Sequence, residues 1–119
     1  MTDPAGMQVL YYQMADGRRP MEEWLDALSE DKLAFAAIQT RIDRIERGLT
    51  GDWKTVGGGV SELRIDHGPG YRVYFGRDGL KVIVLLCGGI KSTQSRDIKT
   101  AKKYWSDYEK RKPPGGSAA

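Results

Sequence analysis

Hydrophobic and polar residues alternate through much of the stretch from Val60 to Cys87, which is the pattern of β-strands. The alternation predicts strands at residues 60–66, 70–76 and 80–87. Gly68-Pro69-Gly70 is typical of a turn between the first two, and Asp78-Gly79 of a hairpin between the last two. The third strand is almost wholly apolar, which favours a strand covered on both faces. We therefore expect an antiparallel meander.

A three-to-four-residue spacing of apolar positions upstream predicts two helices. A short strand is expected at Val9–Tyr12, and Pro20 suits the first turn of the helix that follows. That helix has an apolar stripe of Met21, Trp24, Leu25 and Leu28. Ser29 is the expected N-cap of the second helix, which should end near Arg47 before Gly48. Its apolar stripe comprises Leu33, Phe35, Ala37, Ile38, Ile42 and Ile45.

The remaining segments complete an α+β domain. Residues 49–59 hold four glycines and read as a loop, with a short strand around 53–56 as an option. A last helix is expected from residues 93–95 to about Lys110, so the predicted order is β-α-α-β-β-β-α. We predict one domain at residues 7–112, with flexible ends at residues 1–6 and 113–119, because 119 residues suit one core and both ends have small, polar composition.

Charge is distributed unevenly along the chain. Residues 1–50 carry six Lys and Arg against nine Asp and Glu, whereas residues 51–119 carry thirteen against seven. A basic C-terminal half is the footprint of a surface that meets phosphate, although such a face can also be merely solvated. The single Cys87 lies in an apolar run and indicates a buried thiol in a reducing cytoplasm. The N-terminus has no export signal pattern and no apolar run is long enough to span a membrane, so we expect no membrane partner.

Three stretches of sequence resemble a known family: ELRIDHGPGYRVYF, LLCGGIKSTQSRDIKTAK and the two-helix region MEEWLDALSEDKLAFAAIQTRIDRIERGLTGDWKTVGGGVSELR. Together they resemble the phage-derived, HigB-like branch of the RelE/ParE toxin superfamily, also called addiction-module killer proteins. The resemblance covers roughly residues 9–108. It implies a RelE-like fold, in which a twisted, mainly antiparallel sheet packs against an N-terminal helical hairpin and a C-terminal helix and leaves a concave basic face.

The resemblance also implies a function. Such proteins are toxins of type II toxin–antitoxin pairs that cleave messenger RNA, often on the translating ribosome, and leave a 2′,3′-cyclic phosphate and a 5′-hydroxyl. The implied partners are the messenger, the ribosome and a small antitoxin, often a helix-turn-helix DNA-binding protein. The sequence has one His, one Cys and no acidic cluster with ligand spacing, so we expect a metal-independent mechanism without a cofactor.

Catalytic residues are expected on the two strands that flank the Gly-Pro-Gly turn. Arg72 aligns with the arginine that RelE-like toxins place against the scissile phosphate, and Arg64 matches a cationic position on the preceding strand. Glu62 stands where relatives carry a lysine. It could accept a proton, orient Arg64 or Arg72 through a bidentate pair, or mark a shifted acid–base apparatus; we favour the orienting role. Lys91 could neutralise charge on the phosphate.

Other candidates have equally plausible structural roles. His67 could transfer a proton or be an exposed turn residue. Ile98 replaces a tyrosine that some RelE toxins use, and Tyr71 could substitute for it or simply pack in the sheet. Trp53 could contact a base or a partner, whereas Trp24 and Trp105 fit helix-to-sheet packing. The expected RNA-binding residues are Lys54, Tyr71, Arg96, Lys99 and Lys102.

Two other functions remain open from the sequence. A ParE-like inhibitor of DNA gyrase would share the fold, and Glu62 together with the absent tyrosine is compatible with it. A non-catalytic remnant that binds RNA or an antitoxin is the other alternative.

Overall fold

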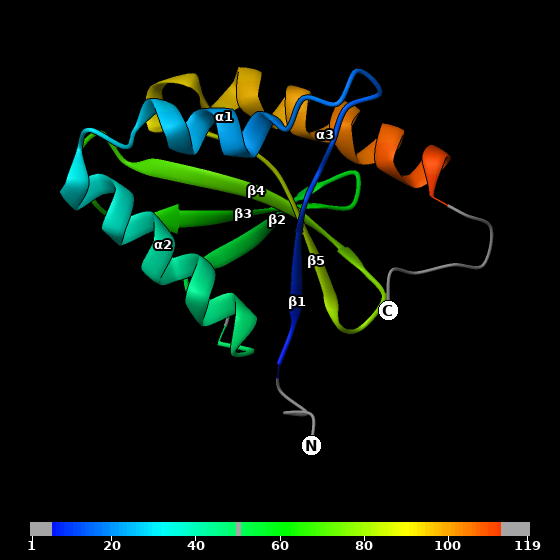
Figure 1. Ribbon diagram of the computed structural model, residues 1–119, viewed down its shortest axis with the longest axis horizontal. Helices are drawn as coiled ribbons and strands as arrows, with labels where there is room; N and C mark the ends of the chain where they lie inside the picture. The colour runs from blue at the N-terminus through cyan, green and yellow to red at the C-terminus, as the bar shows by residue number, and fades with distance from the viewer. Residues whose placement is uncertain (1–5, 50, 113–119) are drawn as a thin grey trace.

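A five-stranded mixed sheet forms the centre of the computed structural model, which describes residues 6–49 and 51–112 (Figure 1). The strand order is β1-β5-β4-β3-β2. β1 pairs with β5 in parallel, and the other neighbours are antiparallel. The strands are β1 (Gln8–Tyr11), β2 (Trp53–Gly57), β3 (Val60–Ile65), β4 (Tyr71–Asp78) and β5 (Val82–Ile90).

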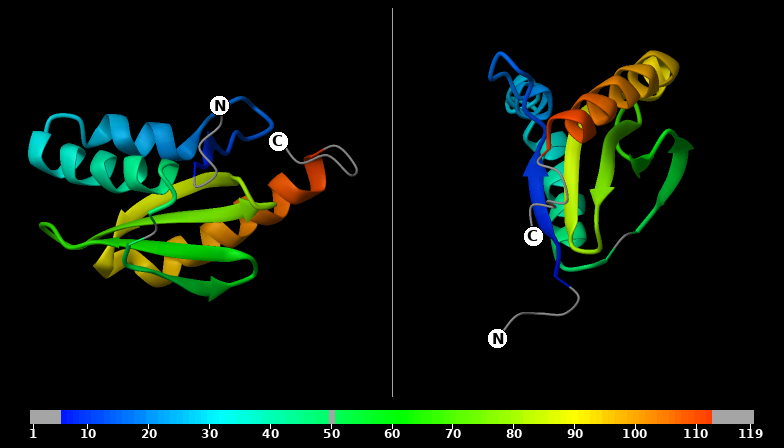
Figure 2. Two further views of the ribbon diagram at one scale, coloured as in Figure 1. Left: turned by 90° about the horizontal axis from the view of Figure 1, so that it is seen from below. Right: turned by 90° about the vertical axis from the view of Figure 1, so that its right-hand side faces the viewer.

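The helices lie on opposite faces of this sheet. α1 (Pro20–Ala27) and α2 (Lys32–Glu46) cover one face, while α3 (Gln94–Arg111) follows a 3-10 turn (Lys91–Thr93) and packs on the other (Figure 2). The predicted α+β class is confirmed. The predicted order lacked one strand: the segment expected to be a loop contains Trp53–Gly57, which pairs with β3 where a short strand at 53–56 had been the option. The prediction of flexible ends falls on residues 1–6 and 113–119, of which 1–5 and 113–119 lie outside the described residues.

Each face of the sheet has its own hydrophobic core. The α1/α2 side is built around Met21, Leu25, Ile38, Ile42, Leu63, Val73, Phe75 and Leu85. The α3 side is built around Val60, Tyr74, Val84, Leu86, Ala101 and Trp105. β5 contributes to both cores, which confirms the prediction of an apolar strand covered on both faces. Cys87 is buried as predicted, and burial raises the pKa of its thiol to about 12.

The boundaries of α2 differ from the predicted ones at its start. Asp31, not Ser29, caps the helix by accepting a hydrogen bond from the Ala34 N–H at 3.1 Å, whereas the Ser29 hydroxyl donates to the Asp26 carbonyl. The buried stripe is Ala34, Ile38, Ile42 and Ile45, so Leu33 falls one position outside it and is 74% exposed. The helix ends at Glu46, and Gly48 has φ +81, as a C-terminal glycine should.

Two tryptophans pack directly on glycines of the sheet, in agreement with the predicted packing role. A Cβ at Gly88 would lie 2.2 Å from the Trp24 ring, and a Cβ at Gly76 would lie 2.3 Å from the Trp105 ring. The two glycines therefore set how closely α1 and α3 approach the strands.

The C-terminal end of α3 is tied to the sheet through buried and half-buried carboxylates. Asp78 accepts hydrogen bonds from the Tyr108 hydroxyl at 2.6 Å and from the Lys112 amine at 3.2 Å. Asp107 accepts from the Tyr12 hydroxyl at 2.6 Å. Within residues 6–49 and 51–112, none of the helices has the length and apolar character that a membrane crossing needs.

We expect Gly76→Ala to lower the free energy of unfolding by about 1–3 kcal/mol, because Trp105 is buried and cannot move away from the added methyl group. Urea unfolding followed by circular dichroism measures the change. Ser106→Ala is the matched control. Ser106 is exposed on α3, next to Trp105, and the change should alter stability by less than about 0.5 kcal/mol. Equal stability of the two variants would contradict this packing account.

A second prediction concerns acid stability. The hydrogen bond from Tyr108, aided by Lys112, holds the pKa of Asp78 below its ordinary value. The group therefore stabilises the fold above the unfolded-state pKa of about 3.9, and this contribution disappears as pH falls through the lower folded-state pKa. We expect Asp78→Asn to lose stability at pH 7 and to show a shallower decline between about pH 5 and pH 2. Urea unfolding across this range tests it, with the exposed Asp26→Asn as control; parallel curves for Asp78→Asn and wild type would contradict it.

Candidate functional site

Arg64 and Arg72 lie on neighbouring strands, as the sequence predicted, and they are directly opposite each other. β3 and β4 pair so that Arg64 faces Arg72 and Glu62 faces Tyr74. Because side chains alternate along a strand, all four project to one face of the sheet. Tyr74 belongs to the core beneath α3, so this is the face that α3 covers.

The Glu62 carboxylate lies between the two arginines. Its Oε1 atom is 3.9 Å from Arg72 Nε and 4.0 Å from Arg64 Nε. Its Oε2 atom accepts hydrogen bonds from Gln94 Nε2 at 2.6 Å and from the Tyr74 hydroxyl at 3.1 Å. Burial together with the Glu62 charge raises the pKa of Tyr74, so this phenol remains a hydrogen-bond donor at neutral pH. One carboxylate thus compensates two guanidinium groups that would otherwise repel each other across the strands.

The exposure of these side chains divides their roles. Glu62 is 0% exposed and Arg72 8%, whereas the Arg64 side chain is 42% exposed. Glu62 is covered in this arrangement, which favours the orienting role over that of proton acceptor. The predicted bidentate pair does not form, since both Nε atoms approach a single oxygen at distances too long for a hydrogen bond. Glu62 Oε1 and both Nε atoms have no hydrogen-bond partner among the described residues.

A cleft of about 400 Å³ opens beside the arginines. It is lined by Asp52, Arg64, Asp66, Gly68, Pro69, Gly70, Arg72 and Lys91. Lys91 is exposed, and its backbone N–H donates to the Gly70 carbonyl at 2.8 Å, which holds the start of the 3-10 turn against the Gly-Pro-Gly turn. Three predicted phosphate-binding cations therefore share one cleft, together with two carboxylates.

His67 and Tyr71 are not brought into this cleft. Tyr71 is 6% exposed and packs on the α1/α2 side, with its ring centroid 6.0 Å from that of Trp24. The His67 ring stacks on Tyr71 with centroids 6.3 Å apart. The predicted catalytic and RNA-binding roles require these residues to lie near the arginines. Because side chains alternate along β4, Tyr71 and Arg72 point to opposite faces of the sheet. Ile98 is half-buried in the core beneath α3.

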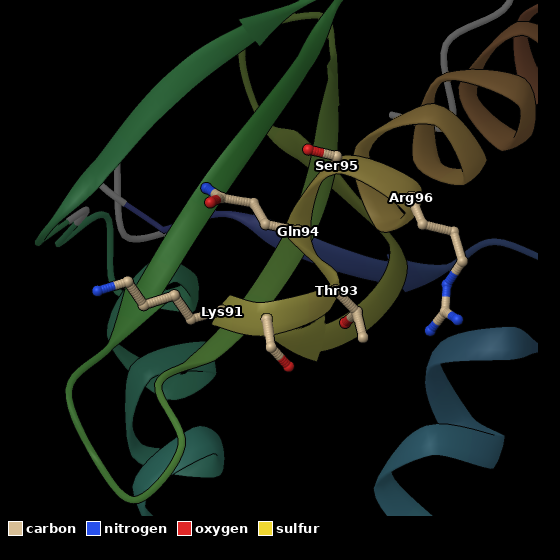
Figure 3. A pocket seen from close by; sticks show the side chains of 6 residues that line it. Lys91, Thr93, Gln94, Ser95 and Arg96 are labelled. Atoms are coloured by element: carbon tan, nitrogen blue, oxygen red, sulfur yellow. The ribbon is translucent and has the colours of Figure 1, made fainter.

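The remaining cationic candidates spread over a wider surface. Lys54 is exposed and stands opposite Glu62 in the β2–β3 register, so it extends the cationic face. Lys102 lies against the Gly57–Gly58 turn, and Lys99 is exposed on α3. Arg96 is 76% exposed, lies 3.7 Å from Asp97 and points away from Lys91 (Figure 3). Trp53 packs on Phe75 and beneath Arg77, which leaves its ring unsuited to stacking on a base.

A second hollow of about 350 Å³ runs along the segment from Lys91 to Arg96. Figure 3 shows Lys91 and Gln94 directed to one side of this segment and Arg96 to the other. Lys91 lines both hollows, so it links the beginning of α3 to the arginine cleft.

Several contributors could not be found from the sequence. Gln94 and Tyr74 hold Glu62, and Arg41 of α2 donates from Nη1 to the Arg64 carbonyl at 2.6 Å. Desolvation lowers the pKa of Arg41. The only sequence signal for Gln94 was its place at the predicted start of the last helix. The described residues contain no group of three His, Cys, Asp or Glu side chains that could hold a metal ion.

Comparison with known proteins places the chain in a family. The model of the family described as "Phage derived protein Gp49-like (DUF891)" matches residues 23–111, which include most of α1 and all of α2, the arginine strands and α3. The chain belongs to the Gp49-like family. This family is RelE-like and toxin-related. An uncharacterised protein of Haemophilus influenzae (strain Rd) is 49% identical over 81 residues, which make up 68% of this chain and 81% of the relative.

Removing the shared carboxylate of this Gp49-like protein should destabilise it more than removing the exposed arginine. Glu62→Gln leaves Arg64 and Arg72 facing each other without a counter-charge, and loss of one partner from a buried ion pair costs on the order of 3 kcal/mol. Arg64→Gln should cost less than about 1 kcal/mol, because Arg64 is partly solvated. Chemical unfolding of both variants gives the two values. A smaller loss for Glu62→Gln than for Arg64→Gln would show that Glu62 does not hold the arginine pair.

Proposed function

We propose that this Gp49-like protein is a toxin of the HigB-like branch of type II toxin–antitoxin systems: a metal-independent endoribonuclease that cleaves messenger RNA, on the translating ribosome, and thereby stops translation. The observation that carries the proposal is that Arg64 and Arg72, both close to the buried Glu62, line one cleft together with Lys91. The toxin-related family supports it.

The chemistry that these groups support is transesterification of the RNA backbone. The substrate 2′-oxygen bonds to phosphorus, the bond from phosphorus to the 5′-oxygen breaks, and the proton lost by the 2′-hydroxyl is balanced by one gained by the leaving oxygen. Negative charge builds on the non-bridging oxygens as the reaction proceeds. Guanidinium groups held in advance stabilise that charge without having to reorganise.

The three cations divide this task according to how firmly they are held. Arg72 is nearly buried, with its Nη1 atom donating to the Tyr71 carbonyl at 3.1 Å, so it supplies a fixed contact to the phosphate. Arg64 and Lys91 are more exposed and line the same cleft, so they supply further contacts to the bound strand. Positioning and charge stabilisation can supply much of the acceleration in phosphoryl chemistry.

The partners follow from the same surface. Lys54, Lys91 and Lys99 are exposed, and their cationic surface suits the messenger and ribosomal RNA. A small antitoxin, of the helix-turn-helix DNA-binding class, would inhibit the toxin by covering this surface. The proposed site of action is the cytoplasm.

The test is to map 5′ ends of messenger RNA after brief induction of wild type, Arg72→Ala and Lys91→Ala. Wild type should create new 5′-hydroxyl ends within translated frames. Arg72→Ala should reduce them at least about 100-fold, which is the usual effect of losing one transition-state donor. Lys91→Ala should reduce them more moderately, and its exposure means that the fold is retained.

Two variants serve as matched controls. Arg77→Ala removes an exposed arginine on the same strand, outside the cleft. His67→Gln changes a side chain that stacks on Tyr71 rather than lining the cleft. Both should cleave like wild type. Growth arrest without new ends would instead support a gyrase inhibitor, which a supercoiling assay detects, and neither arrest nor cleavage would support a non-catalytic remnant.

A further inference from the structure

The arginine cleft contains two carboxylates that a site for phosphate alone does not need. Asp52 and Asp66 line the cleft with Arg64, Arg72 and Lys91. Both aspartates are exposed. Among the described residues, neither side chain forms an ion pair within 4.0 Å or accepts a hydrogen bond, so both keep their acceptor capacity.

Both aspartates stand on backbone that is fixed by hydrogen bonds. The Asp52 carbonyl accepts from the Arg64 N–H at 3.0 Å and from Arg41 Nη2 at 3.4 Å. A bond of 3.0 Å from the His67 N–H to the Ile65 carbonyl closes a tight turn around Asp66. The two carboxylates are therefore presented at set positions on the rim rather than from free loops.

A buried cation, Arg72, lines the same cleft and is held from behind by Glu62 and the Tyr71 carbonyl. The Arg72 side chain is only 9% exposed, lines the cleft, and its Nε atom has no hydrogen-bond partner. A guanidinium in that position is suited to a phosphate, whereas the carboxylates repel one. The cleft thus has a cationic part that favours the phosphate of a nucleotide and an acidic part that favours a hydrogen-bond donor.

We propose that Asp52 and Asp66 select guanine in the nucleotide next to the phosphate held by Arg72. This inference rests on the proposed RNA substrate and names the base that the site prefers. A carboxylate only accepts hydrogen bonds, and guanine alone presents two adjacent donors, N1–H and N2–H, that match its two oxygens. Adenine and cytosine offer one amino group and uracil one imino group on their pairing edges, and specific RNA recognition reads these edges in single strands.

The size of the cleft is compatible with this occupant. Its volume of about 400 Å³ lies within the range of small-ligand sites, which begins at about 300 Å³. The Gly68-Pro69-Gly70 turn lines it without bulky side chains. A base can therefore lie along the turn while its phosphate contacts the arginines.

The first test uses the base composition around the mapped 5′ ends. Wild type should show guanine at one fixed position beside the cleavage point. Asp52→Asn and Asp66→Asn should each reduce this preference about tenfold, because an amide places a donor against the donors of guanine. Asp26→Asn, an exposed aspartate of α1 outside the cleft, should leave it unchanged. An unchanged preference in both cleft variants, or a uniform rise in cleavage at all sequences, would overturn the inference and leave the nuclease proposal intact.

The second test does not depend on cleavage. Fluorescein-labelled, 2′-O-methyl hexanucleotides, identical except for one central G, A, C or U, are titrated with the full chain at low salt and followed by fluorescence anisotropy. The G oligonucleotide should bind about tenfold more tightly than the others, and the advantage should disappear in Asp66→Asn or Asp52→Asn. Equal binding of the four, or no binding, would overturn the inference. Preferential binding of G without any new ends in cells would keep base selection and reject the nuclease.

Discussion

The contacts of the buried Glu62 carboxylate are the interactions on which the arrangement of the arginine cleft depends. This carboxylate receives hydrogen bonds from β4 through Tyr74 and from α3 through Gln94, and it is flanked by Arg64 and Arg72. Two guanidinium groups at one cross-strand position would repel each other without it. A charge with no solvent exposure needs several partners at once. The two carboxylate oxygens of Glu62 therefore couple the register of β3 and β4, the position of α3 and the orientation of the arginines.

This arrangement separates the groups that hold the arginines in place from the groups that can contact a ligand. Glu62, Tyr74 and Gln94 are covered or half-covered, whereas Arg64 and Lys91 extend into the cleft. Such a division is a common solution for a polyanion site, because cations must be close together before the ligand arrives and their repulsion must be compensated from behind. In the proposed RNA site, the carboxylates of Asp52 and Asp66, which line the cleft, would add selectivity for a base to the attraction for phosphate.

Local pattern was enough to predict the meander, the two helices after β1 and the presence of Arg64 and Arg72 on neighbouring strands, because strand alternation and turn chemistry identify strands and the turns between them. It offered β2 only as an option within a loop, since glycines at positions 57–59 concealed a strand whose stability comes from pairing with β3. It placed Tyr71 with Arg72, although adjacent strand residues point to opposite faces. Gln94 was missed for a different reason: its partner lies 32 residues away, and only the packing of α3 brings them together.

The parallel pairing of β1 with β5 has a consequence for synthesis of the chain. Gln8 pairs with Val82, and β5 also lies beneath α1. The first strand and the helical hairpin are therefore made long before the strand on which they dock, and closing so large a loop slows folding. Gln94 follows β5, so the arginines gain their full set of supports only after β5 and the start of α3 have been made. A growing chain therefore lacks the assembled cleft until β5 and the start of α3 have been made, and the ribosome that makes it is not exposed to a finished site before that point.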